Sequence, residues 1–487
     1  MKKYNFFNIL IILTINTLII IFFDVTFHES QKSWVAERIF TENNRFLNFT
    51  YGPIYLIYLK IIRFLVDYPH FIKVELLISS TIFLISFYKF INIFFKKAES
   101  LFITIPIIPI VLLIESRQNL LASALFIIYM INLSKEKKLC YLPLSLLISA
   151  LIARTFVPLL FLNIFFCLIL NKKFPKFKIK KIKYYIKLLL ICFATFSYNF
   201  QWEDPKNNHM LYDTTYSPNI DYNNPLEIGF FQFSNQRIAN EKNDSKTDWL
   251  LNFDRNFNNN NSLKKVVLNE PKIIFDSIIY NIPPFIYVIS KTILSAGYII
   301  LPYKIKIFTS FIIIIIILFG LFLIFRGKFS INNKIVYLPV IFYLPIFVSS
   351  LLITNPTFRY FYLILPIFMI IFYIPIKFFL KRFFFTFIIL SCVVNFYFNL
   401  NYYNKFIRTD FQKTEKIQLF LDDQKGSEIK IITNEKNLLT VINNENKIYI
   451  GFDSIPPYFD KKIKKLISES NYVIFNDSAK SYDDIST

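Results

Sequence analysis

The chain has 487 residues, of which 54% are hydrophobic and only 18% are charged, and its mean hydropathy is +0.44. A soluble domain averages about 25% charged residues, so this composition excludes a disordered or fibrous chain and predicts a polytopic membrane protein. The net charge of +22 would suit a nucleic-acid-binding protein. The lysines cluster between apolar segments, however, as in the cytoplasmic loops of membrane proteins. We therefore expect membrane lipids and no nucleic acid among its partners.

The N-terminal segment is predicted to form the first transmembrane helix, with its N-terminus in the cytoplasm. Lys2 and Lys3 precede an apolar run that continues to Phe23, and no small-residue cleavage site follows, so we expect no removable signal peptide. Ten further stretches are apolar enough to be spans, although several are shorter than the ~20 residues that a crossing needs. They are 72–95, 100–115, 119–134, 139–153, 155–170, 183–200, 305–325, 335–353, 359–376 and 383–398.

Two more apolar stretches are ambiguous, because 51–66 is interrupted by Lys60 and Arg63, and 281–302 contains Pro283, Pro284 and Lys291. If both lie at the membrane interface, every basic loop falls on the side of the N-terminus, as the positive-inside rule requires. Those loops are Lys96-Lys97, 135–138, 172–183, 326–334 and 377–382. We expect about 11 spans on this count, or about 13 if both stretches cross.

The predicted fold is an α-helical polytopic membrane domain over 1–400, followed by a small extracytoplasmic α/β domain over 405–487. The membrane domain would carry two large outer loops, 24–71 and 201–304. In the tail, strands are predicted at 428–433, 447–452 and 472–475, with helical segments at 409–423, 435–443 and 458–470. Strands that alternate with helices indicate an α/β unit, and it contains no Gly-rich phosphate loop.

Under this topology, ionisable residues gather at the outer face, where such residues are functional candidates because their burial is costly. They are Asp24, His28, Glu29, Glu115, Arg117, Arg154 and Arg359. A carboxylate can act as a base on an acceptor hydroxyl, and arginines can hold a phosphate leaving group bidentately. Each arginine could equally be a headgroup anchor. His28 has no second His or Cys at metal spacing, so we expect neither a metal site nor another cofactor.

The first outer loop resembles that of the GT-C glycosyltransferases. The similarity lies in the segment 27–39 (FHESQKSWVAERI) and in 51–56 (YGPIYL). It is closest to the protein O-mannosyltransferase and lipid A aminoarabinose transferase branch, which carries an Asp-Glu pair after span one and a Pro-Pro-Leu-Tyr-like segment before the next span. Asn269-Glu270-Pro271 and the segment 357–366 (TFRYFYLILP) resemble further family segments, and the α/β tail resembles tails of bacterial members.

The resemblance implies an inverting sugar transfer from a polyprenyl-phosphate donor to a glycan, lipid or protein acceptor, outside a bacterial cytoplasmic membrane. Arg359, Arg117 and Arg154 are the candidates for binding the donor phosphate. The family's first acidic position aligns with His28, and only Glu29 keeps the acid. Glu29 is therefore one candidate for the general base and Asp24 is the other, unless the family pair has a different role here.

Two other functions compete. The segment 116–122 (SRQNLLA) resembles the Arg-Gln…Ala pattern of Wzy-like polysaccharide polymerases, which generally lack a soluble α/β tail. A lipid or polysaccharide transporter is the third possibility, but transporters tend to show repeated halves and Gly/Pro-broken spans. This chain has 7 glycines and no evident repeat, so a glycosyltransferase is the preferred interpretation.

Overall fold

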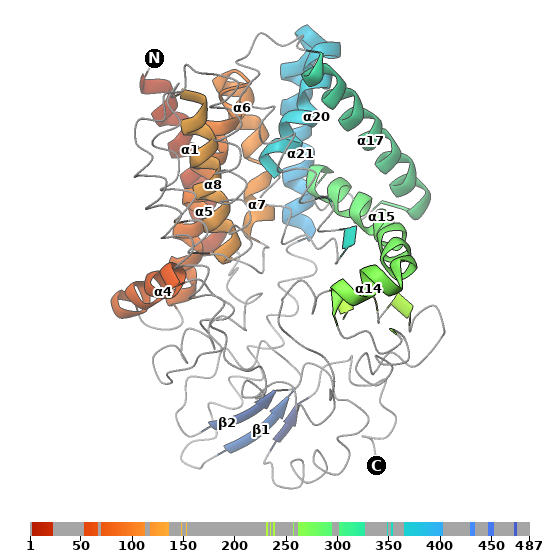
Figure 1. Cartoon of the computed structure of the whole chain (residues 1–487). Coiled ribbons are helices and arrows are strands. Elements are labelled where there is room, and N and C mark those ends of the chain that lie inside the picture. Colours follow the sequence, from red (N-terminus) through yellow and green to blue (C-terminus); the bar gives the residue numbers. More distant parts are fainter. Residues whose placement is uncertain are drawn as a thin grey trace, which may run out of the picture.

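The computed structural model describes residues 2–22, 53–66, 70–112, 117–135, 262–294, 301–326, 365–402, 429–433, 447–451 and 472–474, with isolated positions between 148 and 353. Figure 1 shows a bundle of helices, with the described strands lying beyond one of its ends.

The helices fall into two groups along the chain. The first group consists of α1 (Lys2–Phe22), α4 (Pro53–Leu65), α5 (His70–Ile91), α6 (Lys97–Thr104), α7 (Ile107–Leu112) and α8 (Arg117–Lys135). The second consists of α14 (Leu263–Asn269), α15 (Pro271–Leu294), α17 (Tyr303–Phe325), α20 (Leu365–Leu380) and α21 (Phe384–Tyr402), with the 3-10 turn η8 (Lys381–Phe383) joining the last two.

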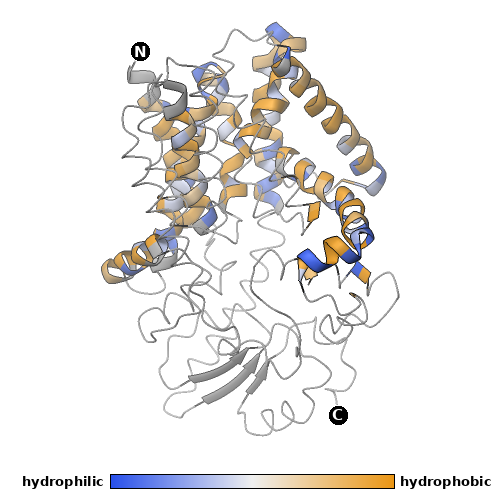
Figure 2. Cartoon of the chain, in the orientation of Figure 1, coloured by the Kyte–Doolittle hydropathy of each residue, from blue (hydrophilic) through white to orange (hydrophobic). Residues whose placement is uncertain are grey.

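The composition of these helices identifies a membrane protein. Within the described residues, four helical stretches are long and apolar enough to cross a bilayer: Lys73–Ile91, Pro271–Lys291, Tyr303–Ile324 and Leu365–Asn401, the last of which comprises α20, η8 and α21. Most residues of the described helices are hydrophobic (Figure 2), and many of their side chains are exposed. On α17, for example, Phe308, Phe311 and Leu318 are each at least 60% exposed. Side chains of this kind are stable in contact with lipid and would be a liability in water.

Several predicted spans coincide with described helices. The stretches 1–23, 119–134, 305–325 and 383–398 correspond to α1, α8, α17 and α21. The ambiguous stretch 51–66 forms α4, whose 13 residues would cover only about 20 Å, which is less than the ~30 Å hydrocarbon core. The predicted spans 139–153, 155–170, 183–200 and 335–353 lie almost wholly outside the described residues.

The predicted span 100–115 contains two short helices, α6 and α7, so the prediction of one continuous helix was wrong. The break falls at Pro106, because proline has no backbone N–H to donate to the preceding turn. The carbonyl of Pro106 accepts a hydrogen bond of 3.0 Å from the buried side-chain amide of Asn399 on α21. An unpaired carbonyl in an apolar bundle would be costly, and α21 therefore supplies the compensating donor.

The second ambiguous stretch, 281–302, overlaps α15, which contains Pro283 and Pro284. The helix is long and apolar enough to cross. In Figure 1, α15 lies beside the lower part of α17. The hydroxyl of Ser290 on α15 donates to that of Ser310 in the first half of α17, at 3.1 Å. The last turns of α15 thus pack on the first part of α17.

The strands in the tail occupy the predicted places. They are β1 (Ile429–Thr433), β2 (Lys447–Gly451) and β3 (Tyr472–Ile474), and they form a parallel sheet of order β2-β1-β3. In the register, Ile431 lies opposite Tyr449 on one side and Tyr472 on the other. The helices predicted between these strands lie outside the described residues.

Hydrogen bonds and ring contacts give the direction of each helix. The side chain of Asn8 donates to the Tyr88 hydroxyl, and that of Asn16 donates to Ser80, each at 2.9 Å, so α1 and α5 are antiparallel. Phe95 stacks on Phe384 while Pro106 contacts Asn399, so α6 and α7 run in the same direction as α21.

The bundle therefore has two distinct ends. We call one the basic end and define it by Lys96, Lys97, Lys377, Lys381 and Arg382. The other, where α4 and α14 lie (Figure 1), is the α4 end. The chain leaves α1 at the α4 end, and α7 runs toward it. Only four residues separate α7 from α8, so α8 must begin at this end too. The start of α20 is likewise directed away from the basic end.

Gly320 allows α17 and α20 to cross at close range. A Cβ atom at this position would overlap the backbone carbonyl oxygen of Ile371, and small residues are common where membrane helices approach closely. We expect Gly320→Ala to destabilise the protein by roughly 1–3 kcal/mol through overpacking. Thermal unfolding in detergent, followed by size-exclusion chromatography, measures the effect.

The matched control for this experiment is Leu318→Ala on the same helix, where the side chain is 60% exposed. This variant should unfold close to the wild-type temperature. Equal melting temperatures for Gly320→Ala and the control would show that the close crossing contributes nothing to stability.

Candidate functional site

A buried carboxylate lies at the α4 end, between α4 and α5. Glu75 is 2% exposed, and its Oε1 accepts hydrogen bonds of 3.0 Å from the hydroxyls of both Tyr55 and Ser79. The hydroxyl of Tyr58 lies 3.1 Å from that of Ser79 and donates to the backbone carbonyl of Glu75 at 3.3 Å. We call these four residues the Glu75 cluster.

The sequence of α4 explains how the cluster forms. Tyr55, Leu59 and Ile62 are spaced at helical intervals and are all at most 4% exposed, so this face packs on the bundle. The opposite face presents Ile57 and Phe64, which are 57% and 88% exposed. Both faces are thus apolar, and hydroxyl groups on the inner face provide its polar link to α5.

The energetics make this cluster a candidate site. An isolated carboxylate in apolar surroundings costs several kcal/mol, and donors such as the Tyr55 and Ser79 hydroxyls offset part of that cost. Glu75 lies inside the candidate span Lys73–Ile91, and ionisable residues at membrane depth are functional candidates by default. The sequence already carried that signal, since Glu75 lies within the predicted span 72–95. The sequence analysis nevertheless did not select Glu75.

The helices α1, α5 and α8 also carry buried polar side chains. Asn16 donates to Ser80 at 2.9 Å and to Thr81 at 3.3 Å. On α8, Asn119 and Ser123 are 6% and 0% exposed, and their side-chain oxygens have no hydrogen-bond partner among the described residues. Since the two residues are four apart, they share one face of α8. This part of the bundle therefore offers hydrogen-bonding groups as well as apolar packing.

Three of the predicted site residues, Asp24, Arg117 and Arg359, lie in the sequence at or near helix termini that are directed toward the α4 end. Asp24 follows the last residue of α1 by two positions, and Arg359 precedes the first described residue of α20 by six. Arg117 is the first residue of α8, and its side chain lies outside the described part. Asp24, Glu29, Arg154 and Arg359 lie outside the described residues altogether, as do His28 and Glu115.

A buried arginine was also missed by the sequence analysis. Arg237 is 6% exposed and lies in the predicted outer loop 201–304. Three nearby rings, Phe230, Phe231 and Phe257, pack together with centroid separations of 4.9–6.2 Å and form a small apolar core with Val266 of α14. Arg237 is therefore a buried basic residue that the sequence analysis did not select.

Metal binding has no structural counterpart in the described part of the chain. No group of three or more His, Cys, Asp or Glu side chains lies close enough together there to hold an ion. The polar groups described at the α4 end include the carboxylate of Glu75 and the hydroxyls of Tyr55, Tyr58 and Ser79.

Comparison of this chain with protein-family models, with curated proteins and with solved structures finds no match. A function must therefore be argued from the chain's own residues.

The hydroxyl of Tyr55 should contribute measurably to stability. Tyr55→Phe removes one donor from the buried Glu75 carboxylate, and hydrogen bonds to charged groups contribute about 1.5–3 kcal/mol. We expect a loss of that size, measured as a lower midpoint of thermal unfolding in detergent. The control is Tyr303→Phe, where the side chain is 77% exposed. If both variants unfold at the same temperature, the Tyr55–Glu75 hydrogen bond does not hold α4 in place.

Proposed function

We propose that this chain is a membrane glycosyltransferase. It moves a sugar from a polyprenyl-phosphate-linked donor to a glycan, lipid or protein acceptor, with inversion, and a carboxylate acts as the general base. The proposal rests on the set of groups that the structure brings together at the α4 end. The buried carboxylate of Glu75, the short helix α4, the end of α1 and the starts of α8 and α20 all belong to this one end of the bundle.

The proposed reaction uses the residue types found there. The acceptor oxygen attacks the anomeric carbon from the face opposite the phosphate, the bond between that carbon and the phosphate oxygen breaks, and polyprenyl phosphate leaves. Glu29 or Asp24 takes the acceptor's proton as the new bond forms. Arg359, with Arg117 and Arg154, binds the phosphate, whose charge grows as the bond breaks.

The exposed apolar face of α4 supports a lipid-borne substrate. Ile57, Ile61 and Phe64 are 55–88% exposed on a helix too short to cross the membrane. A helix with such a face lies in the membrane interface with its apolar side chains among the acyl chains. A polyprenyl donor meets the protein at that same boundary, where its phosphate is at headgroup level and its tail remains in hydrocarbon.

Glu75 acts in this proposal as a positioning residue. Its hydrogen bond from Tyr55 fixes α4 against α5, and α4 begins directly after the loop that carries Asp24 and Glu29. Fixing the end of that loop restricts the positions that its carboxylates can reach, which matters because catalysis depends on the position of the base.

The proposed topology follows the charges. Lysines and arginines are concentrated at the basic end, so we assign that end and the N-terminus to the cytoplasm, and the α4 end and the C-terminal strands to the outside. The strands also favour the predicted α/β domain. Parallel neighbours need a crossover of a dozen or more residues, usually a helix, and 13 residues separate β1 from β2 while 20 separate β2 from β3.

Loss of the general base should stop transfer while leaving the donor bound. Glu29→Gln keeps the shape of the side chain but removes its charge, and general-base loss typically costs roughly 10²–10⁴-fold in rate. Turnover of a radiolabelled polyprenyl-phosphate sugar in membranes measures the effect, and Asp24→Asn is the matched variant. A dead Asp24→Asn with a near-normal Glu29→Gln would reverse the two roles. Full activity in both would remove this loop from the mechanism.

Arg359 should not be replaceable by lysine. A guanidinium forms two parallel hydrogen bonds with a phosphate, whereas an ammonium is a point charge. We expect Arg359→Lys to fold normally and to lose most transfer activity, with weaker donor binding in the same membrane assay. Arg326→Lys, at the other end of the bundle, serves as the control. Undiminished transfer by Arg359→Lys would make Arg359 an interfacial anchor.

The experiment that tests the function itself is mass analysis of envelope glycans and lipid-linked sugars in cells with and without the protein. Accumulation of lipid-phosphate sugar, together with loss of a single-sugar modification, is the expected result. Shortened glycan chains that retain their single units would instead indicate a polymerase. Lipid-linked glycans trapped on the cytoplasmic side would indicate a transporter.

A further inference from the structure

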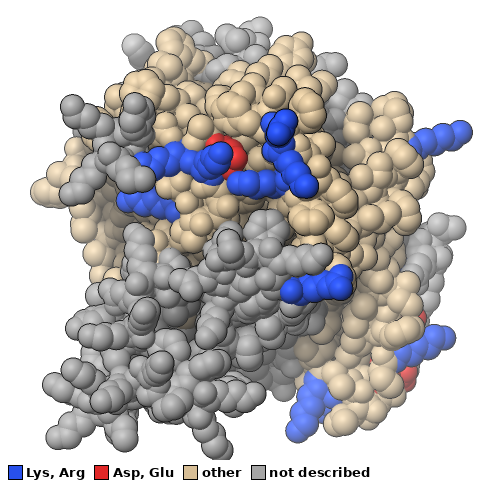
Figure 3. All heavy atoms as spheres, turned by 90° about the horizontal axis from the view of Figure 1, so that it is seen from above, with Lys and Arg blue, Asp and Glu red and all other residues tan. Residues whose placement is uncertain are grey.

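Among the described residues, the basic end carries more positive than negative side chains. Lys96, Lys381 and Arg382 are exposed there. Figure 3 views the molecule from above and shows basic side chains gathered around an acidic one. Glu99 is the described carboxylate at this end, and Lys377 neutralises it, with Nζ and Oε2 2.7 Å apart. The neighbouring cations therefore remain available to an external anion.

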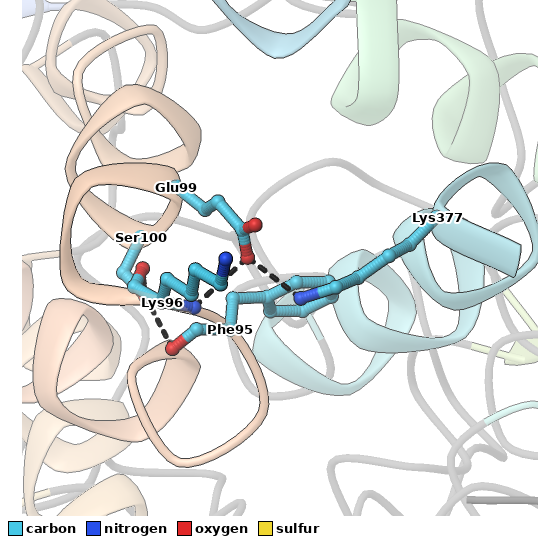
Figure 4. Close-up of polar contacts among 5 residues, drawn as sticks. All are labelled: Phe95, Lys96, Glu99, Ser100 and Lys377. Carbon is cyan, nitrogen blue, oxygen red and sulfur yellow. Dashed lines mark hydrogen bonds and ion pairs between the residues drawn. The ribbon is translucent and has the colours of Figure 1, made fainter. Parts of the chain in front are cut away.

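The ion pair is also a rigid part of the fold. The backbone N–H of Lys96 donates to the same Oε2 of Glu99 at 2.9 Å. The Lys377 ammonium lies 5.1 Å from the ring centroid of Phe95 (Figure 4) and 5.5 Å from that of Phe384. These contacts hold the start of α6 against both α20 and α21. Lys96, Lys381 and Arg382 are therefore attached to helices whose relative positions are fixed.

The turn between α20 and α21 presents its charges outward. Lys381 has φ = 38°, a left-handed conformation that costs a side-chain-bearing residue energy. The flanking contacts maintain it, because Lys377 is fixed before the turn and Phe384, which is 1% exposed, is buried after it. In this conformation both Lys381 and Arg382 face away from the protein.

Exposed aromatic rings lie next to these charges. Phe379 and Phe383 are 67% and 73% exposed and flank Lys381 and Arg382 in the chain. On α17, the guanidinium of Arg326 lies 5.5 Å from the Phe322 ring, and that ring is itself 49% exposed. Cations and apolar rings thus alternate along this end, which matches a ligand that has an anionic head and a hydrocarbon body.

We propose that the basic end binds an anionic phospholipid. Its phosphate contacts Lys96, Lys381 and Arg382, and its acyl chains contact the rings of Phe379 and Phe383. A soluble phosphate or a nucleic acid would satisfy the charges but would leave these rings in water. Each Lys or Arg near an anionic membrane surface strengthens binding about fivefold. This proposal does not depend on the enzymatic activity, so either can fail without the other.

Native mass spectrometry of the full chain, with phosphatidylglycerol and phosphatidylcholine of matched acyl chains, tests the proposal. The wild type should retain phosphatidylglycerol preferentially. Lys381→Gln/Arg382→Gln should weaken phosphatidylglycerol binding about 25-fold, while phosphatidylcholine binding stays unchanged. The charge-conserving Lys381→Arg/Arg382→Lys should keep the preference. Equal binding of the two lipids by the wild type would overturn the proposal.

Two controls assign the effect to this surface and to a lipid. Lys264→Gln/Lys304→Gln removes two exposed lysines from the α4 end and should leave the preference within twofold, whereas an equal loss there would show a general charge effect and contradict the site. Phe379→Ala/Phe383→Ala should weaken phosphatidylglycerol binding while Lys381 and Arg382 remain in place. Displacement of phosphatidylglycerol by an equal concentration of inorganic phosphate would assign the surface to a soluble anion and overturn the proposal.

Discussion

A carboxylate buried in an apolar helix bundle must be hydrogen-bonded or ion-paired, and the described structure meets this constraint twice. Glu75 is bound by hydroxyls from α4 and α5, and Glu99 is bound by Lys377 of α20. The two residues lie toward opposite ends of the bundle and use different chemistry. Neutral donors surround the first, whereas a cation over aromatic rings neutralises the second. Each fixes a helix that apolar packing alone would leave free to slide in a membrane, where lipid competes for the same contacts.

The two ends consequently suit different partners. At the α4 end, the hydroxyls of Tyr55 and Ser79 donate to Glu75, and Tyr55 belongs to α4, a helix too short to cross the membrane. At the basic end, Glu99 is neutralised and an excess of lysine and arginine remains. The first arrangement supports the proposed chemistry on a lipid-linked sugar, and the second supports the proposed binding of an anionic phospholipid. This polarity supports the proposed orientation in the membrane.

Hydropathy predicted most of the described helices because a long apolar run has few other stable structures in a membrane. The same reasoning missed the break at Pro106. The free carbonyl at this break is hydrogen-bonded by Asn399, which lies almost 300 residues away in the chain. The close crossing at Gly320 likewise depends on a partner helix that periodicity does not identify. The aromatic core around Phe257 was missed because Asn and Asp dominate its surroundings and indicate a loop. The site residues predicted from the sequence remain predictions, because Asp24, Glu29, Arg154 and Arg359 lie outside the described residues. Glu75 lies inside the predicted span 72–95, but its contacts with α4 are what identified it.

The orientation of the two ends is the central claim, and single-cysteine labelling of intact cells tests it most directly. Lys60 on α4 and Lys381 in the turn after α20 are both exposed. Each is replaced by cysteine in a chain whose four native cysteines are changed to alanine. We predict that a membrane-impermeant maleimide labels Lys60→Cys in intact cells and labels Lys381→Cys only after permeabilisation. The reverse pattern would contradict the account.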